Sequence, residues 1–267
     1  MRALLTNDDG ILAPGLTALW AGLREVAEVT VVAPDTELSG TGHAISMRKP
    51  VMCHRAERED DFRGYSLEGT PADCVKVGLT ELQEGGTDLV VAGINLGANT
   101  GIHVLYSGTV AAALEGAMAG ICSVAVSLVW SHEPDYAGAA RVAVPLIERI
   151  LALADSRGTV FNINIPPETG LVRGVRLARQ SRIAIADRYV RRQDPRGRMY
   201  FWIEGDGNAD KSEPDSDRAA LAEGFVTVTP LSFDLTDERL MSSLSRLTWT
   251  GSEERGESRV ADSQQAG

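Results

Sequence analysis

LLTNDDGI, residues 4–11, is the stretch of sequence that decides the fold class. The apolar residues 3–6 predict a short buried strand, and two adjacent aspartates and a glycine follow it directly. Asp-Asp-Gly is a common turn element, so this stretch has a plain reading as a loop that leaves the strand. Adjacent carboxylates repel each other, however, so their place at a strand end also suggests a ligand of opposite charge.

The alternation of strands and helices continues along the chain. Further strands are predicted for residues 29–33, 88–93, 124–129 and 160–165, and helices for residues 16–26, 71–82, 108–119 and 136–153. Runs rich in β-branched residues and separated by helices are typical of a parallel sheet covered on both faces. We therefore predict an α/β fold with a doubly wound, mostly parallel sheet.

The last third of the chain has a different character. Nine arginines and two aspartates lie between residues 173 and 198, and RYVRRQDPRGRMYFW (188–202) predicts a β-hairpin around an Asp-Pro-Arg-Gly turn. We expect this polar, aromatic hairpin to be a projecting arm that contacts a partner, with recruitment of polyanions as the alternative. Beyond it we predict an acidic loop over 204–217, a strand over 224–230, an amphipathic helix over 237–247 and a disordered tail over 251–267.

The length of 267 residues suits one large α/β domain. We expect a single domain over 1–267. Its core covers about residues 1–180, and its C-terminal arm and extension cover about 181–250.

The composition excludes several classes of partner. The formal net charge of −11 disfavours a sequence-independent nucleic-acid binder, so no nucleic-acid partner is expected. Cys53, Cys74 and Cys122 have no paired spacing, which indicates free thiols in a reducing compartment. Acidic residues come too early for a signal peptide and no apolar run is long enough to span a bilayer. We therefore expect a cytoplasmic protein without a membrane partner.

Four polar, glycine-bearing loops follow predicted strands or open a helix. They are NDDG (7–10), SGTGH (39–43), GINLGANTG (93–101) and YSGT (106–109). Each has a plain structural reading, because Ser-Gly and Gly-x-Asn supply ordinary turns and Ser107 suits a helix N-cap. In an open α/β sheet, however, ligands bind where the carboxyl ends of strands lead into helices. The joint placement of the four loops therefore favours one shared site.

The oxygen donors in these loops indicate what the site holds. Two carboxylates, a hydroxyl and an amide carbonyl are hard donors, which suit Mg²⁺ or Mn²⁺ and suit zinc poorly. Such a cation would remove the repulsion between Asp8 and Asp9. Ser107, Gly108 and Thr109 would hold phosphate oxygens at a helix N-terminus. A cation site beside an anion site is the arrangement that metal-assisted phosphate hydrolysis uses.

Together these motifs resemble the SurE family, stationary-phase survival proteins that act as nucleoside monophosphate phosphatases. NDDG, SG at 39–40, GINLGANTG, YSGTVAAALEG (106–116), GTPADCV (69–75) and DPRGRMYFWI (194–203) carry the resemblance. It implies a Rossmann-like core, one divalent metal ion per subunit and homodimers or homotetramers that assemble through the C-terminal extension. By position, it implies that the metal ligands are Asp8, Asp9, Ser39 and Asn95.

We therefore predict a divalent-metal-dependent phosphatase that hydrolyses nucleoside 5′-monophosphates, with 3′-monophosphates as candidate further substrates. The catalytic candidates are Asp8, Asp9 and Asn95. The phosphate-binding candidates are Asn95, Asn99, Ser107, Gly108 and Thr109. Further candidates for the site are Asn7, Gly40 and His43.

Several alternatives stay open at the level of sequence. Attack by water and an aspartyl-phosphate route through Asp8 are both compatible with these residues. A short-chain exopolyphosphatase and a non-catalytic nucleotide-binding stress sensor would use the same motifs. No aromatic residue is assigned to the base, so the sequence does not predict base preference.

Overall fold

The computed structural model describes residues 1–57, 62–153, 155–183, 188–204 and 213–247. The chain divides into two compact units, Met1–Phe233 and Asp234–Gly267. The first unit carries the sheet and all the predicted site residues.

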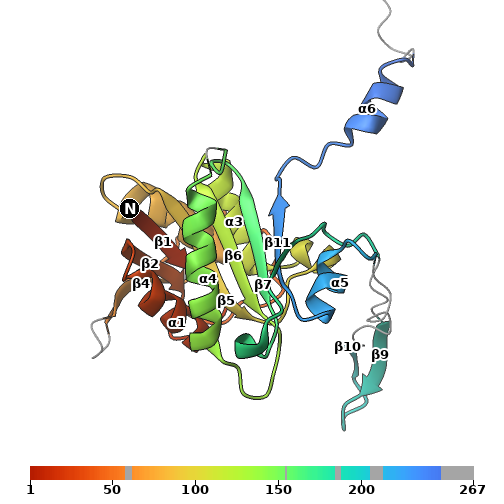
Figure 1. The fold of residues 1–267 in the computed structure, drawn as a ribbon. Coiled ribbons are helices and arrows are strands. Elements are labelled where there is room, and N and C mark those ends of the chain that lie inside the picture. Colours follow the sequence, from red (N-terminus) through yellow and green to blue (C-terminus); the bar gives the residue numbers. More distant parts are fainter. Residues whose placement is uncertain (58–61, 154, 184–187, 205–212, 248–267) are drawn as a thin grey trace, which may run out of the picture. The chain divides into compact units, whose positions relative to one another are not determined.

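A nine-stranded sheet forms the centre of the first unit (Figure 1). In spatial order its strands are β3 (Cys53–Glu57), β4 (Arg63–Leu67), β2 (Glu28–Pro34), β1 (Arg2–Thr6), β5 (Leu89–Leu96), β6 (Cys122–Leu128), β7 (Val160–Ile165), β11 (Val226–Leu231) and β8 (Val175–Leu177). The central strands pair in parallel, with Leu5 of β1 opposite Val31 of β2 and Val91 of β5. Within the described sheet, the antiparallel pairs are β3 with β4 and β7 with β11. The predicted doubly wound, mostly parallel sheet is confirmed.

Helices cover both faces of this sheet. The helices of the first unit are α1 (Pro14–Leu23), α2 (Pro71–Val77), α3 (Gly108–Met118), α4 (Tyr136–Leu151) and α5 (Asp217–Ala222), with short helical turns at Gly78–Leu82, Gly101–Leu105 and Thr169–Leu171. Leu16 of α1 and Ile147 of α4 share one core cluster with Leu5. Val75 of α2 and Val110 of α3 share the other core cluster with Leu4. Successive residues of β1 therefore point to opposite layers, as expected for a strand buried on both faces.

Local sequence signals fix where these helices begin. Pro14 starts α1, and Thr70 and Asp73 form a reciprocal capping box at the start of α2. The hydroxyl of Ser107 accepts a hydrogen bond from the Val110 N–H, and Asp135 caps α4 through the Gly138 N–H. The start of α3, which borders the site, is thus set by its own N-cap.

Two predicted helices and several strands differ from the structure. The helix predicted over 16–26 ends at Leu23, and the helix predicted over 71–82 changes to a π-helical turn at Gly78–Leu82. A Cβ at Gly78 would lie 2.7 Å from Leu4, so the chain packs directly onto β1 at this point. The sequence did not reveal β3, β4 or β8, because these short strands, at or next to the edges of the sheet, lack continuous apolar runs.

The predicted hairpin is present as β9 (Arg188–Gln193) and β10 (Met199–Glu204). Gln193 pairs with Met199, and the Gly197 N–H donates to the Asp194 carbonyl in the turn between the strands. Most side chains of both strands are exposed. The hairpin is therefore confirmed.

The predicted acidic loop over 204–217 needs a correction. Its residues 205–212 lie outside the described part of the chain, but Asp217 begins α5 and is fully buried. The Asp217 carboxylate accepts backbone N–H groups of Gly101 and Ser181, at 2.9 and 3.0 Å. The end of this segment is thus part of the packed unit, because a buried carboxylate needs such donors. The strand predicted over 224–230 is β11.

The described part of the second unit contains α6 (Glu238–Leu244), which confirms the helix predicted over 237–247 with shorter bounds. Asp237 caps it by accepting the Leu240 N–H. The tail predicted over 251–267 lies outside the described residues. Within the described ranges, no helix combines the length and the apolar character needed to cross a membrane.

Candidate active site

Asp8 lies where β1 ends and directly against the start of α3. Its side chain is 4% exposed, and its Oδ1 accepts the hydroxyl of Thr109 at 2.5 Å. A Cβ on Gly108 would lie 2.8 Å from the Asp8 Cβ and 2.9 Å from Oδ2. Only glycine therefore allows this close approach between helix and carboxylate.

Asn7 shapes the loop that carries the two aspartates. It is fully buried, and its amide donates to the Gly10 carbonyl and accepts the Gly10 N–H, at 2.9 and 3.2 Å. Gly10 has φ +100°, which an L side chain rarely adopts. Asn7 is thus committed to the turn, and the structure gives it a shaping role.

The two carboxylates have unusual proton affinities. Burial, and then the Asp8 and Glu37 carboxylates, raise the pKa of Asp9 to about 6. Burial also raises the pKa of Asp8, although hydrogen bonds from Thr109 oppose this. Among the described residues, no salt bridge neutralises either carboxylate. The pair is therefore a place where a cation would be stabilised.

The loop after β2 brings Ser39 and an unpredicted residue, Glu37, to this region. The Leu38 N–H donates to the Asp8 carbonyl at 2.8 Å, which holds the loop on the NDDG turn. Ser39 is exposed, and its hydroxyl donates to the Glu37 carboxylate at 2.7 Å. Gly40, with φ +72°, has open space around it and serves the turn. Sequence alone does not single out Glu37 as a site residue, because an acidic residue two positions before a serine is a common pattern.

Asn95 follows an irregularity in β5. The register between β5 and β6 shifts between Gly93 and Asn95, and a Cβ on Gly93 would lie 2.3 Å from the Val126 carbonyl oxygen. The Asn95 amide nitrogen donates to the Gly97 carbonyl at 2.8 Å. The side-chain oxygen is therefore the atom that Asn95 has to offer a cation.

Asn99 is tied to the strands beneath it. Its backbone N–H donates to Asn164, its side-chain amide donates to Ser127, and its carbonyl accepts from Asn162, at 2.8, 2.9 and 2.7 Å. With 8% exposure, Asn99 anchors the GINLGANTG loop on β6 and β7. This anchoring needs three long-range partners, so sequence spacing alone does not reveal it.

The first turn of α3 is partly occupied by protein groups. Ser107 caps the helix through the Val110 N–H, at 3.1 Å. Thr109 is fully buried, and both its hydroxyl and its backbone N–H bond to Asp8. Among the described residues, this leaves the Gly108 N–H and the Ser107 hydroxyl proton as the donors of this turn.

His43 lies against α3 and not against the aspartates. Its Nε2 is 2.8 Å from the Oε1 of Glu115 in α3, and the other oxygen of Glu115 is 2.8 Å from the Nζ of Lys76. Glu115 thus contacts both the loop that carries His43 and helix α2, and its place inside the helix that begins at YSGT predicts such a bracing role.

The donor set at the strand ends fits a hard divalent cation. In the described ranges, no group of three or more His, Cys, Asp or Glu side chains gathers to hold a metal. The predicted set has only two such side chains and completes them with a hydroxyl and an amide oxygen. Hard oxygen donors of this kind suit Mg²⁺ or Mn²⁺, and the unneutralised pair Asp8 and Asp9 supplies the charge.

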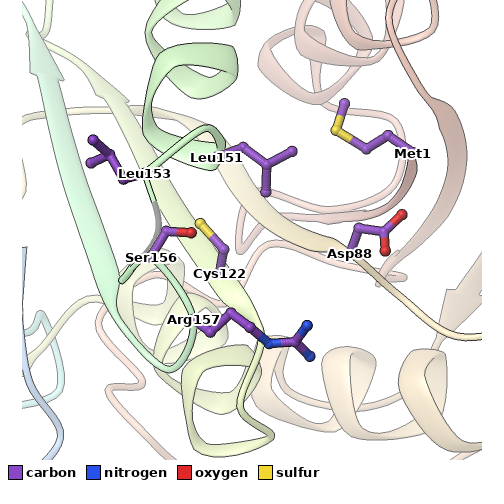
Figure 2. A pocket seen from close by; sticks show the side chains of 7 residues that line it. All are labelled: Met1, Asp88, Cys122, Leu151, Leu153, Ser156 and Arg157. Atoms are coloured by element: carbon purple, nitrogen blue, oxygen red, sulfur yellow. The ribbon is translucent and has the colours of Figure 1, made fainter.

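A separate cavity of about 390 Å³ opens elsewhere on the first unit (Figure 2). Its lining includes Met1, Asp88 and Cys122, which lie at the amino ends of β1, β5 and β6. Ligands of open α/β sheets bind at the carboxyl ends, and no predicted site residue lines this cavity. It is therefore distinct from the candidate active site.

Comparisons with known proteins show which family the chain is similar to. A family model described as Survival protein SurE matches residues 3–187. The 5′-nucleotidase SurE of Syntrophus aciditrophicus (strain SB) is 43% identical over 249 residues, which cover 92% of this chain and 94% of that protein. The 5′-nucleotidase SurE of Rhodopirellula baltica (strain DSM 10527 / NCIMB 13988 / SH1) is 46% identical, with 91% and 97% covered.

A solved structure gives the same result. The crystal structure of the SurE protein from Aquifex aeolicus superposes with a TM-score of 0.80 at 36% identity, and covers 92% of this chain and 98% of that one. The family resemblance of the motifs is confirmed: the chain belongs to the SurE family.

Proposed function

We propose that this chain is a divalent-metal-dependent 5′-nucleotidase that releases phosphate from nucleoside 5′-monophosphates and, as further substrates, 3′-monophosphates. The enzyme class follows from family membership and from relatives of that name at 43% and 46% identity over nine-tenths of the chain. The observation that carries the proposal is the contact between Asp8 and the start of α3. It puts a carboxylate pair suited to a cation beside a helix N-terminus suited to a phosphate.

Four residues would hold one Mg²⁺ or Mn²⁺ per subunit. They are Asp8, Asp9, Ser39 and Asn95. When bound, the cation supplies Lewis acidity and neutralises charge on the transferred phosphoryl group. Its binding requires both aspartates to be ionised, which the raised pKa of Asp9 makes harder below about pH 6.

The remaining residues divide between phosphate binding and positioning. We assign the Ser107 hydroxyl and the Gly108 N–H to the phosphate oxygens, because they are the donors left in the first turn of α3. Thr109 fixes the Asp8 carboxylate through two hydrogen bonds, so its role is positioning. Asn99 holds the loop that presents Asn95.

Phosphate release from AMP tests this function. Purified protein with Mn²⁺ should release phosphate from 5′-AMP, and both EDTA and Asp8→Asn should abolish the release. AMP binding without turnover would favour the nucleotide-binding stress sensor. Faster release from tripolyphosphate than from AMP would favour the short-chain exopolyphosphatase.

We also propose that the chain forms homodimers or homotetramers through its C-terminal extension. Tyr189, Phe201 and Trp202 of the hairpin are 70%, 57% and 60% exposed. Large apolar side chains gathered on one exposed hairpin are typical of an interaction surface. A cytoplasmic location is part of the proposal and agrees with the three free cysteines.

A further inference from the structure

Glu115 is a buried carboxylate that the proposed reaction does not use. It lies in the middle of α3 with 6% of its side chain exposed. One oxygen is 2.8 Å from Nε2 of His43, and the other is 2.8 Å from Nζ of Lys76 in α2. A buried carboxylate is unfavourable without partners, so α3 depends on both contacts to carry this charge.

His43 belongs to the loop after β2 and follows Ser39 by four residues. Ser39 is exposed, and its hydroxyl is bonded within the loop, to Glu37. Gly40 and Gly42 have φ values of +72° and +56°, and a Cβ on Gly40 would meet no atom within 4 Å. Around Gly40 the stretch that carries Ser39 therefore has little packing to fix it, and within the stretch the Thr41 hydroxyl donates to the Leu38 carbonyl at 3.0 Å.

The two ends of this stretch are fixed to the rest of the site. Before Ser39, the Leu38 N–H donates to the Asp8 carbonyl. After it, the Gly42 N–H donates to the Tyr106 carbonyl at 3.0 Å, and the His43 ring meets Glu115. The charge on Glu115 makes the His43 contact stronger than a hydrogen bond between neutral groups.

Helix α3 connects this anchor with Asp8. Thr109 donates to Asp8, and Glu115, six residues further along the same helix, holds His43. One helix thus sets the positions of Asp8 and of the loop that carries Ser39.

We propose that His43, Glu115 and Lys76 form a positioning cluster that fixes Ser39 relative to Asp8 for cation binding. His43 anchors the loop by binding Glu115 on α3, and Lys76 compensates the buried charge of Glu115. The role rests on the proposed function, because Ser39 is a ligand only in a site that holds a cation.

Three variants test this role. His43→Ala removes the side-chain anchor and leaves the backbone hydrogen bond from Gly42 to Tyr106 in place. It also leaves the pair of Lys76 and Glu115 intact, so α2 and α3 stay packed. His43→Gln restores a side-chain N–H donor of similar reach. His54→Ala is the matched control, because His54 forms an exposed pair with Glu68 at 3.6 Å on the β3–β4 side of the sheet.

Two measurements are needed, and neither depends on turnover. Electron paramagnetic resonance of free Mn²⁺ gives the metal Kd, and hydrogen–deuterium exchange of the metal-free protein gives the protection of residues 38–46. We expect His43→Ala to raise the Mn²⁺ Kd about five- to twentyfold, because only part of the roughly ten- to a hundredfold effect of one lost charge-assisted hydrogen bond is passed through the loop to the cation site, and to speed exchange in 38–46. His43→Gln and His54→Ala should stay within about twofold of wild type in both measurements, and the KM for AMP at saturating Mn²⁺ should hardly change in any variant.

Wild-type Mn²⁺ affinity in His43→Ala would overturn the proposal, and so would a His43→Gln variant as weak as His43→Ala. Failure of the proposed function looks different, since the wild type itself would then neither bind Mn²⁺ nor hydrolyse AMP. In that case hydrogen–deuterium exchange still tests whether His43 anchors the loop. Unchanged protection of residues 38–46 in His43→Ala would show that it does not.

Discussion

Replacing Asp9 with asparagine should stabilise the metal-free protein while it abolishes metal-dependent activity. Asparagine keeps the volume of the side chain and removes the charge that burial, Asp8 and Glu37 disfavour. The pKa of Asp9 rises from 3.8 to about 6 in the folded chain. At pH 7 that difference corresponds to about 3 kcal/mol of lost stability, reduced toward about 1 kcal/mol by solvent around the half-buried side chain.

The pH dependence follows from the same shift. The folded state binds the Asp9 proton more tightly than the unfolded state, so it holds more protons between pH 3.8 and about 6. Stability of the metal-free wild type therefore falls as pH rises through this window, and Asp9→Asn should lack that component.

Thermal unfolding in EDTA measures the effect. At about 2–4 °C per kcal/mol for a chain of this size, Asp9→Asn should raise Tm by about 2–12 °C at pH 7.5 and by much less at pH 4. Excess Mn²⁺ should raise the Tm of the wild type and not that of the variant. An Asp9→Asn Tm equal to or below wild type at pH 7.5 in EDTA would refute the reasoning.

Two substitutions in the site and one deletion in the hairpin give three further predictions. Ser107→Ala should cost about 0.5–2 kcal/mol of stability, because a helix cap is lost. It should also lower kcat/KM for AMP about ten- to a hundredfold, because a phosphate donor is lost, while Mn²⁺ affinity stays unchanged. Normal kcat/KM and normal inhibition by phosphate would show that Ser107 is only a cap. Gly108→Ala should push α3 away from Asp8, because the new Cβ would lie 2.9 Å from Oδ2. Thermal unfolding should show a loss of about 1–3 kcal/mol of stability, and most AMP turnover should be lost. Wild-type turnover would show that the site does not depend on this close contact. Deleting residues 191–199 should shift the sedimentation coefficient toward a smaller oligomer with an unchanged circular dichroism spectrum, and an unchanged coefficient would remove the hairpin from assembly.

The sheet could be predicted because its central strands are continuous apolar runs. Val29, Val91 and Val124 belong to such runs. A short, continuous apolar run is typical of a strand that is buried on both faces of a parallel sheet. The edge strand β3 carries mostly exposed, polar residues, and β8 is only the three residues Val-Arg-Leu, so nothing in their pattern separates them from loops. Pairing at a sheet edge is decided by the neighbouring strand, which the local sequence does not contain.

The loops of the site could be predicted, but not the direction of each polar group. Ser107 is both a cap and a candidate donor, and the structure shows the cap directly. The sequence predicts that Thr109 holds phosphate, and the structure shows its hydroxyl donating to Asp8, which Gly108 allows by letting α3 approach so closely. Glu37 enters the site through Ser39, and such contacts between loops depend on how the strands are arranged in space.

The central claim is that Asp8 and Asp9 form a cation site that phosphate hydrolysis requires. The most direct test is a titration of metal-free protein with Mn²⁺, in which bound metal and phosphate release from AMP are measured on the same samples. The proposed site predicts one Mn²⁺ per subunit and turnover that rises in proportion to its occupancy, with both lost in Asp8→Asn. Full turnover in metal-free wild type, or in Asp8→Asn without bound Mn²⁺, would contradict it.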